Sequence, residues 1–94
     1  MTPQRWAAKK FRAHVHDRML AGAKLYGDLS YHRPPHELAS EITDECADIA
    51  GWGRILEART NGGGVRLRLC ILNLMARAAW TVARSLERKL EERR

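Results

Sequence analysis

The sequence is poor in cysteine, and this excludes two classes of small protein. Among 94 residues there are only two cysteines, Cys46 and Cys70. Neither belongs to a Cys-x-x-Cys pair or to a Cys/His spacing typical of zinc sites, and two cysteines do not form a disulfide framework. We therefore expect two buried thiols in a protein of a reducing compartment.

Long apolar runs and strand-like alternation are also missing. No stretch approaches the roughly 20 apolar residues that a membrane-spanning helix needs. Charges interrupt residues 1–18 throughout, unlike the apolar segment of a signal peptide. We therefore expect a cytoplasmic protein with no membrane partner, folded as a single all-α domain over residues 1–94.

Charge is abundant and unbalanced. Lys and Arg number 17 against 11 Asp and Glu, which gives a net charge of +6 and a pI of about 10.0. A basic balance of this size favours an anionic partner, such as a nucleic acid, the phosphates of a nucleotide or an acidic protein surface. The charge balance does not choose among these partners.

Apolar residues at helical spacing predict three helices, at about residues 3–25, 35–59 and 65–92. Thr2 and Pro3 have the residue types of an N-cap and a first helical position. Prolines at 34 and 35 cannot lie inside a helix, and the glycines at 62–64 end the second one. Trp6, Trp52 and Trp80 are expected to anchor a core or an interface.

The second helix gathers acidic residues on one side. On a helical wheel five carboxylates share an arc of roughly 100°: Glu37, Glu41, Asp44, Glu45 and Asp48. Like charges one turn apart repel, and no Lys or Arg occurs at positions 34–53 to relieve them. A divalent cation would neutralise them, and so would arginines of the third helix, or water. Small residues on the opposite side, with Gly51 and Gly53, predict close contact with another helix.

The stretch ELASEITDECADIAGWGRILEAR resembles the acidic helices of MazG-like all-α nucleotide pyrophosphohydrolases. The residues before it, GAKLYGDLSYHRPPHEL, resemble the lead-in of small phage or prophage members, and residues 45–48 match the E-x-x-D element of the family. Over about residues 22–59, the resemblance implies bound Mg²⁺ or Mn²⁺ that holds a nucleoside triphosphate and helps water split off pyrophosphate. It implies catalytic roles for Glu41, Glu45 and Asp48, and Asp44 joins them as a metal ligand.

The chain departs from this family in one respect. The family pattern takes carboxylates from two helices of a four-helix arrangement, whereas here they crowd onto one of three helices. Either a second subunit completes both the bundle and the site in a homodimer, as we expect, or the activity has been lost. Lys24 and Arg54 are candidates to bind the substrate phosphates, and Trp52 is a candidate to stack on the base.

Two other functions remain open. The chain has the size and charge of a non-catalytic interaction protein of phage type, which inhibits or regulates a host complex. The arginines of its first and third helices would then bind an acidic surface of the partner. Direct nucleic-acid binding by arginines of the first and third helices is the other alternative, although no clear helix-turn-helix is present.

Overall fold

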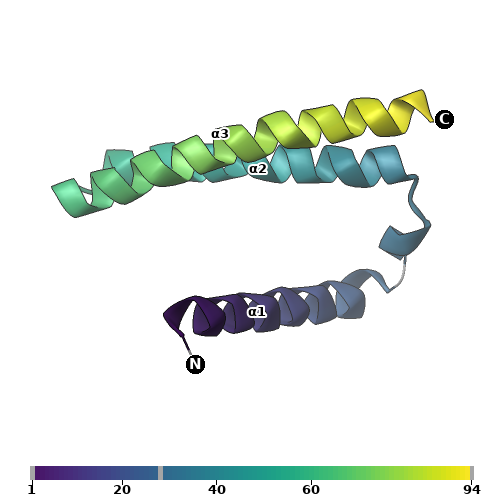
Figure 1. Cartoon of the computed structure of the whole chain (residues 1–94), viewed down its shortest axis with the longest axis horizontal. Coiled ribbons are helices and arrows are strands. Elements are labelled where there is room, and N and C mark those ends of the chain that lie inside the picture. Colours follow the sequence, from purple (N-terminus) through teal and green to yellow (C-terminus); the bar gives the residue numbers. More distant parts are fainter. Residues whose placement is uncertain (1, 28, 94) are drawn as a thin grey trace. The chain divides into compact units, whose positions relative to one another are not determined.

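The computed structural model describes residues 2–27 and 29–93, with the backbone alone for Tyr26. It contains three α-helices and one 3₁₀ turn (Figure 1): α1 (Pro3–Tyr26), η1 (Leu29–His32), α2 (Pro35–Arg59) and α3 (Gly63–Glu92). These residues include no strand, so the predicted all-α fold of three helices is confirmed. None of the described helices has the length and apolar character needed to cross a membrane.

The chain divides into two compact units, Met1–Arg33 and Pro34–Arg94. The first unit holds α1 and η1, and the second holds α2 and α3. The expected single domain stays a prediction, and each unit is described separately below.

Local sequence determines both ends of α1. The hydroxyl oxygen of Thr2 accepts a hydrogen bond of 3.2 Å from the backbone N–H of Arg5, and Pro3 opens the helix. This confirms the predicted N-cap, which satisfies one of the free N–H groups of the first turn. At the other end, Gly27 has φ of 65° and donates its N–H to the carbonyl of Ala23 at 2.8 Å, a conformation that favours glycine.

In the second unit, α2 and α3 form an antiparallel hairpin, lying side by side along their length (Figure 1). Their connection is short, because Gly63 and Gly64 already belong to α3. The helix therefore begins two residues earlier than the predicted Val65. Gly62 has φ of 122°, so the turn itself depends on a backbone conformation open to glycine.

Small side chains make the contact between the two helices. The buried residues of the described chain lie on one line of each helix: Ala39, Thr43, Cys46, Ala76 and Ala83. A Cβ added at Gly53 would lie 3.7 Å from a methyl group of Leu69, which indicates a close approach. The structure thus confirms the predicted helix contact on the small-residue side of α2, at Gly53 but not at Gly51, where an added Cβ would meet no atom within 4 Å.

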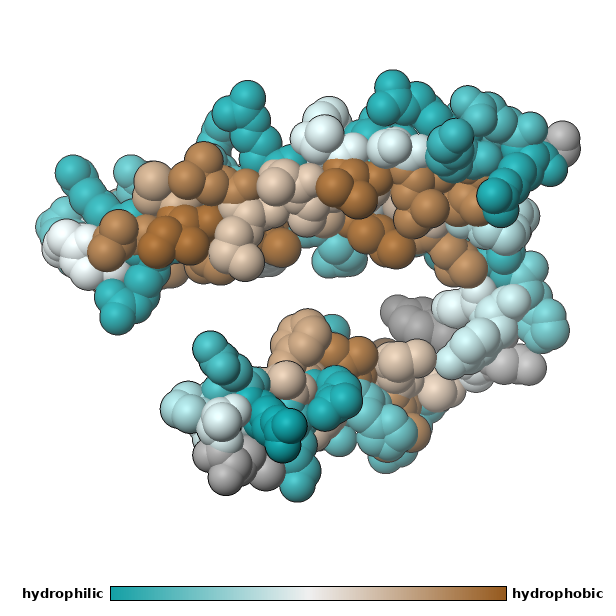
Figure 2. Space-filling view, viewed as in Figure 1, coloured by the Kyte–Doolittle hydropathy of each residue, from teal (hydrophilic) through white to brown (hydrophobic). Residues whose placement is uncertain are grey.

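The large hydrophobic side chains lie outside this contact. Figure 2 shows them gathered along one face of the hairpin, over both helices. We call this surface the apolar face, and it consists of Leu38, Ile42, Ile49, Leu56, Ile71, Leu72, Met75, Val82 and Leu86, each between 36% and 70% exposed. Among the described residues no large side chain is fully buried. The hairpin therefore retains most of its hydrophobic surface in contact with water.

Three sequence predictions about burial fare differently. Cys46 is buried as expected, whereas Cys70 is exposed, because it lies on a side of α3 that is turned away from α2. Trp6, Trp52 and Trp80 are 56%, 71% and 42% exposed, so their expected place in a core is wrong for the single chain. Their alternative role as interface anchors stays a prediction.

Candidate functional site

The five carboxylates predicted to share one side of α2 do so, and all are exposed. We call them the acidic stripe: Glu37, Glu41, Asp44, Glu45 and Asp48. At about 100° per residue, the stripe is centred on the side of α2 opposite the contact line of Ala39 and Cys46. The stripe therefore faces away from α3 and its arginines.

The position of the acidic stripe tests one alternative that the sequence left open, namely that arginines of the third helix neutralise it. Asp44, Glu45 and Asp48 form no ion pair with any residue that the structure describes. Arg84 of α3 instead binds Glu87 on its own helix, at 3.1 Å. Neutralisation of these three carboxylates by the arginines of the third helix is therefore wrong for the single chain, which leaves water or a cation.

Glu41, Asp44, Glu45 and Asp48 are close in sequence, yet they do not surround one point. Across residues 2–27 and 29–93, no three His, Cys, Asp or Glu side chains lie close enough together to hold a metal ion. Side chains that project from one convex helix surface diverge, which explains this. Their oxygen atoms are the donors that Mg²⁺ and Mn²⁺ prefer, so the residues suit such an ion in kind. A complete set requires oxygens from beyond this helix.

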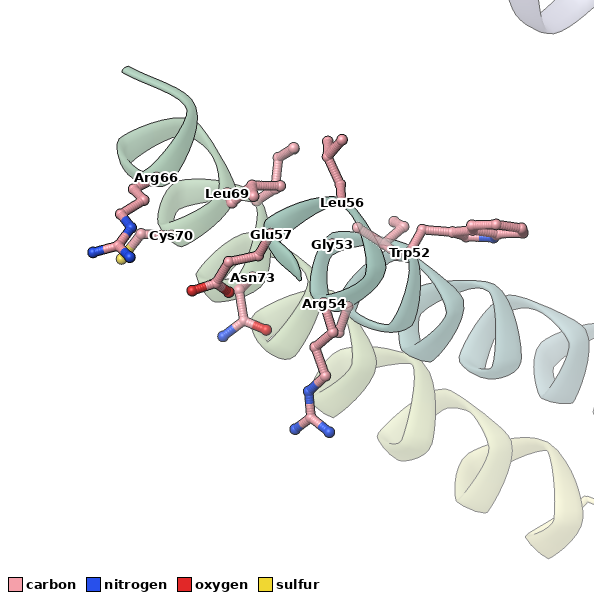
Figure 3. Close-up of a pocket in the computed structure, with 12 residues that line it drawn as sticks. Trp52, Gly53, Arg54, Leu56, Glu57, Arg66, Leu69, Cys70 and Asn73 are labelled. Atoms are coloured by element: carbon pink, nitrogen blue, oxygen red, sulfur yellow. The ribbon is translucent and has the colours of Figure 1, made fainter. Parts of the chain in front are cut away.

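The three candidate substrate residues are divided between the two units. Trp52 follows the acidic stripe and is 71% exposed. Arg54 leaves α2 in a different direction, as Figure 3 shows, and its side chain points away from that of Trp52. Lys24 belongs to α1, in the other unit. Within the hairpin, Trp52 therefore borders the acidic stripe, while Arg54 lies beside α3.

Sequence reasoning missed the polar contact that joins α2 to α3. The hydroxyl of Thr43 lies 3.0 Å from a carboxylate oxygen of Glu87 and 3.1 Å from the carbonyl of Ala39. A hydroxyl has one proton, so Thr43 shares it between these two acceptors. Arg84 donates a further hydrogen bond of 3.1 Å to the same oxygen of Glu87.

The ionisation of Glu87 reflects this environment. Partial burial raises its pKa, but hydrogen bonds from Thr43 and Ser40, together with the guanidinium of Arg84, outweigh that effect. The pKa of Glu87 is therefore lowered from its ordinary value of 4.5, because these donors favour the charged form. The sequence signal for this contact was a lone hydroxyl, Thr43, within a line of small residues.

Two neighbouring hollows lie between the helices. The one in Figure 3, near the turn of the hairpin, has a volume of about 550 Å³ and includes Glu57, Arg66, Cys70 and Asn73 in its lining. The second has a volume of about 420 Å³ and is lined by Cys46, Ala47, Ala50, Gly51, Arg54, Asn73, Ala76, Arg77 and Trp80. Their linings overlap at Ala50, Arg54 and Asn73. The sequence analysis had assigned a role to only one of these arginines, Arg54.

No protein family model, curated protein or solved structure matches the chain.

Proposed function

We propose that the chain is a cytoplasmic, Mg²⁺-dependent nucleoside triphosphate pyrophosphohydrolase that acts as a homodimer. One observation carries the proposal: the carboxylates at 41, 44, 45 and 48 occupy one exposed arc of α2, and the last three of them have no cationic partner among the described residues. Such crowding costs a few tenths of a kcal/mol per like-charged pair. A bound cation converts this repulsion into attraction, and the resemblance to MazG-like enzymes supplies the reaction.

A second copy provides the missing oxygens. The hairpin buries only small residues and leaves its apolar face uncovered, so burial within the chain offsets little of the conformational entropy lost on folding. Two hairpins joined at their apolar faces make a four-helix bundle with the usual two-fold symmetry of dimers.

The acidic stripe borders the surface that this association would cover. Glu45 follows Ile42 by three residues and precedes Ile49 by four, so it is their neighbour on the helix surface. Glu41 has the same relation to Leu38. A two-fold axis through the apolar face therefore brings Glu41 and Glu45 of the two copies toward one another and completes a set of oxygen ligands.

In this assembly Glu41, Glu45 and Asp48 hold the metal ion, and Asp44 contributes a further oxygen. The ion supplies charge neutralisation for the phosphates and lowers the pKa of a bound water. Glu45 lies nearest the apolar face and is the carboxylate placed to orient that water against the phosphorus next to the sugar. Trp52, on the same border, offers its indole ring to the base, and Lys24 and Arg54 stay candidates for phosphate binding.

A specific observation also favours a second candidate, a non-catalytic interaction protein. The apolar face is a surface of the kind that binds another protein. Residues 1–33 hold seven Lys and Arg against two Asp, which leaves most of the net positive charge in that segment. A partner with an acidic rim, or a nucleic acid bound in a salt-dependent manner, would fit this distribution.

The two candidate functions differ in whether the chain hydrolyses a nucleotide. We expect the purified chain with Mg²⁺ to release pyrophosphate from at least one member of a panel of NTPs and dNTPs. Glu45→Gln should lower this rate at least 100-fold, because it removes a ligand charge without changing the shape of the side chain. Glu57→Gln is the matched control, since Glu57 lies on α2 outside the acidic stripe, and it should leave the rate within about twofold.

The absence of pyrophosphate release across the panel, with Mg²⁺ and with Mn²⁺, would rule out the enzyme and leave the interaction protein. Equal losses in Glu45→Gln and Glu57→Gln would show that general charge, and not the acidic stripe, supports the activity.

A further inference from the structure

We propose that the 420 Å³ hollow between α2 and α3 binds a nucleotide without a metal ion, at a site separate from the acidic stripe. We call this hollow the arginine groove and define it by six of the residues that line it: Ala47, Gly51, Arg54, Asn73, Arg77 and Trp80. Its volume falls within the roughly 300–1,000 Å³ of small-molecule sites.

The groove lies on the face of the hairpin opposite the apolar face. On α3, Leu72 and Leu86 lie to one side of the buried line through Ala76 and Ala83, while Arg77 lies to the other, as 100° per residue dictates. A second copy that covers the apolar face therefore leaves the groove open. A ligand can occupy it in the monomer and in the dimer alike.

Two guanidinium groups give the groove its charge. Arg54 reaches it from α2 and Arg77 from α3, and neither forms an ion pair with a described residue. In contrast, the neighbouring Arg84 is already bound to Glu87. Free guanidinium groups on two helices are suited to phosphate oxygens, which they bind with paired, charge-assisted hydrogen bonds. The amide of Asn73 adds a neutral donor and acceptor between them.

One aromatic ring and a row of small residues give the groove its shape. Trp80 is 42% exposed and lines the groove from α3. Ala47 and Gly51 line it from α2, and a Cβ at Gly51 would meet no atom within 4 Å. The space beside Gly51 is therefore open, and base–aromatic stacking on an exposed indole is a common source of nucleotide affinity. Two arginines that can bind phosphate, together with an exposed indole ring, favour a nucleotide over a peptide as the ligand.

This site does not depend on the proposed reaction. It shares Arg54 with the candidate substrate residues but uses neither Glu41 nor Glu45, and the ligand's charge is balanced by Arg54 and Arg77 in place of Mg²⁺. Binding in the presence of a chelator therefore separates the two proposals, because the acidic stripe has no cation under that condition.

The test is calorimetric titration of the full chain with ATP in EDTA. We expect Arg77→Gln to weaken binding at least 10-fold, since it removes one phosphate-binding guanidinium. Arg88→Gln removes the same charge from α3 outside the groove and should change the affinity less than twofold. Glu45→Gln should bind ATP as the parent does.

Gly51→Leu fills the groove while replacing a helix-breaking residue by a helix former. We expect it to lose measurable ATP binding while keeping the helical circular dichroism of the parent and a melting temperature at least as high. Tripolyphosphate and adenosine, the two halves of the probe, should each bind at least 10-fold more weakly than ATP.

Four results overturn the proposal. The first is no ATP binding in EDTA by the parent chain. The second is equal weakening by Arg77→Gln and Arg88→Gln, which means diffuse attraction to a basic protein. The third is tripolyphosphate binding as tightly as ATP, which removes the role of Trp80. The fourth is full ATP binding by Gly51→Leu, which removes the role of the groove.

Discussion

At the scale of single residues, the contact of Glu87 with Thr43 sets the register of the hairpin. It joins side chains 44 residues apart in the chain, at 3.0 Å, within a contact otherwise made of small apolar groups. Small residues alone allow two helices to slide past one another by a turn. A charged acceptor that must meet its donors permits one register, because a displaced carboxylate would lose its hydrogen bonds while partly buried.

This contact makes the stability of the hairpin depend on pH. The pKa of Glu87 is lower in the folded chain than its ordinary 4.5, so the charged form is favoured by folding. Its contribution is complete above about pH 4.5 and is lost as the pH falls through the folded value. We expect the melting temperature of the parent to exceed that of Glu87→Gln at pH 7, and the difference to shrink as the pH falls below about 4.5.

Thermal unfolding followed by circular dichroism at several pH values checks this. Glu57→Gln is the control, and its difference from the parent should show no matching decline. A difference for Glu87→Gln that does not shrink as the pH falls below about 4.5 would mean that the ionisation of Glu87 is not linked to folding.

The contacts and exposure of some residues could be predicted from the sequence, whereas those of others could not. The Thr2 cap was predictable because its partner, Arg5, is three residues away. The role of Glu87 was not, because its partner Thr43 is on another helix and the register was unknown. The exposure of Cys70 and Trp80 was missed for the same reason: an amphipathic pattern shows that a face is apolar but not which neighbour covers it.

At the scale of elements, the hairpin has two distinct surfaces for packing. One is the narrow line of small residues between α2 and α3, and the other is the broad apolar face beside it. Small residues let the helix axes approach closely, so the large side chains next to them are pushed outward. The sequence predicted the first surface from Ala39, Ala47 and Gly53, and it placed the apolar residues correctly on stripes without showing that they stay uncovered.

Enlarging the contact line should separate the helices. Ala76 is 3% exposed, and Ala76→Leu would force a larger side chain against α2, at a cost of about 1–3 kcal/mol. For a unit of this size we expect the melting temperature to fall by roughly 4–8 °C per kcal/mol. Ala58→Leu, at an exposed position of α2, is the matched control and should change stability by about 0.5 kcal/mol or less.

Denaturant or thermal unfolding of the two variants gives the comparison directly. If Ala76→Leu were as stable as Ala58→Leu, α2 and α3 would not be in the close contact described here.

At the scale of the whole molecule, charge and hydrophobic surface are distributed in a way that favours association. α2 holds six acidic and two basic residues, whereas α3 holds six basic and three acidic ones. Two copies related by a two-fold axis can therefore place acidic α2 beside basic α3 around a shared apolar centre. The same arrangement brings four glutamates close together at 41 and 45, and they repel unless a cation lies among them.

The sequence indicated which residues belong to the candidate site, but it did not determine how they are arranged. The acidic stripe was evident from spacing within one helix, and its exposure follows from the side of α2 that α3 covers. In our proposal a second chain completes the site, and no periodicity within one chain determines how two copies meet. Local sequence patterns therefore predicted the helices and the acidic stripe, but they could not predict how two copies associate.

The central claim is that two copies share a metal site, and the molar mass in solution tests it most directly. Sedimentation equilibrium should give twice the 10.7 kDa of the chain in Mg²⁺, and at least 10-fold weaker association in EDTA. The double variant Glu41→Gln and Glu45→Gln should dimerise equally in both conditions, because it lacks the repulsion and the ligands. A monomeric parent chain in Mg²⁺, or a dimer with the same dissociation constant with and without Mg²⁺, would show that two copies do not share a metal site.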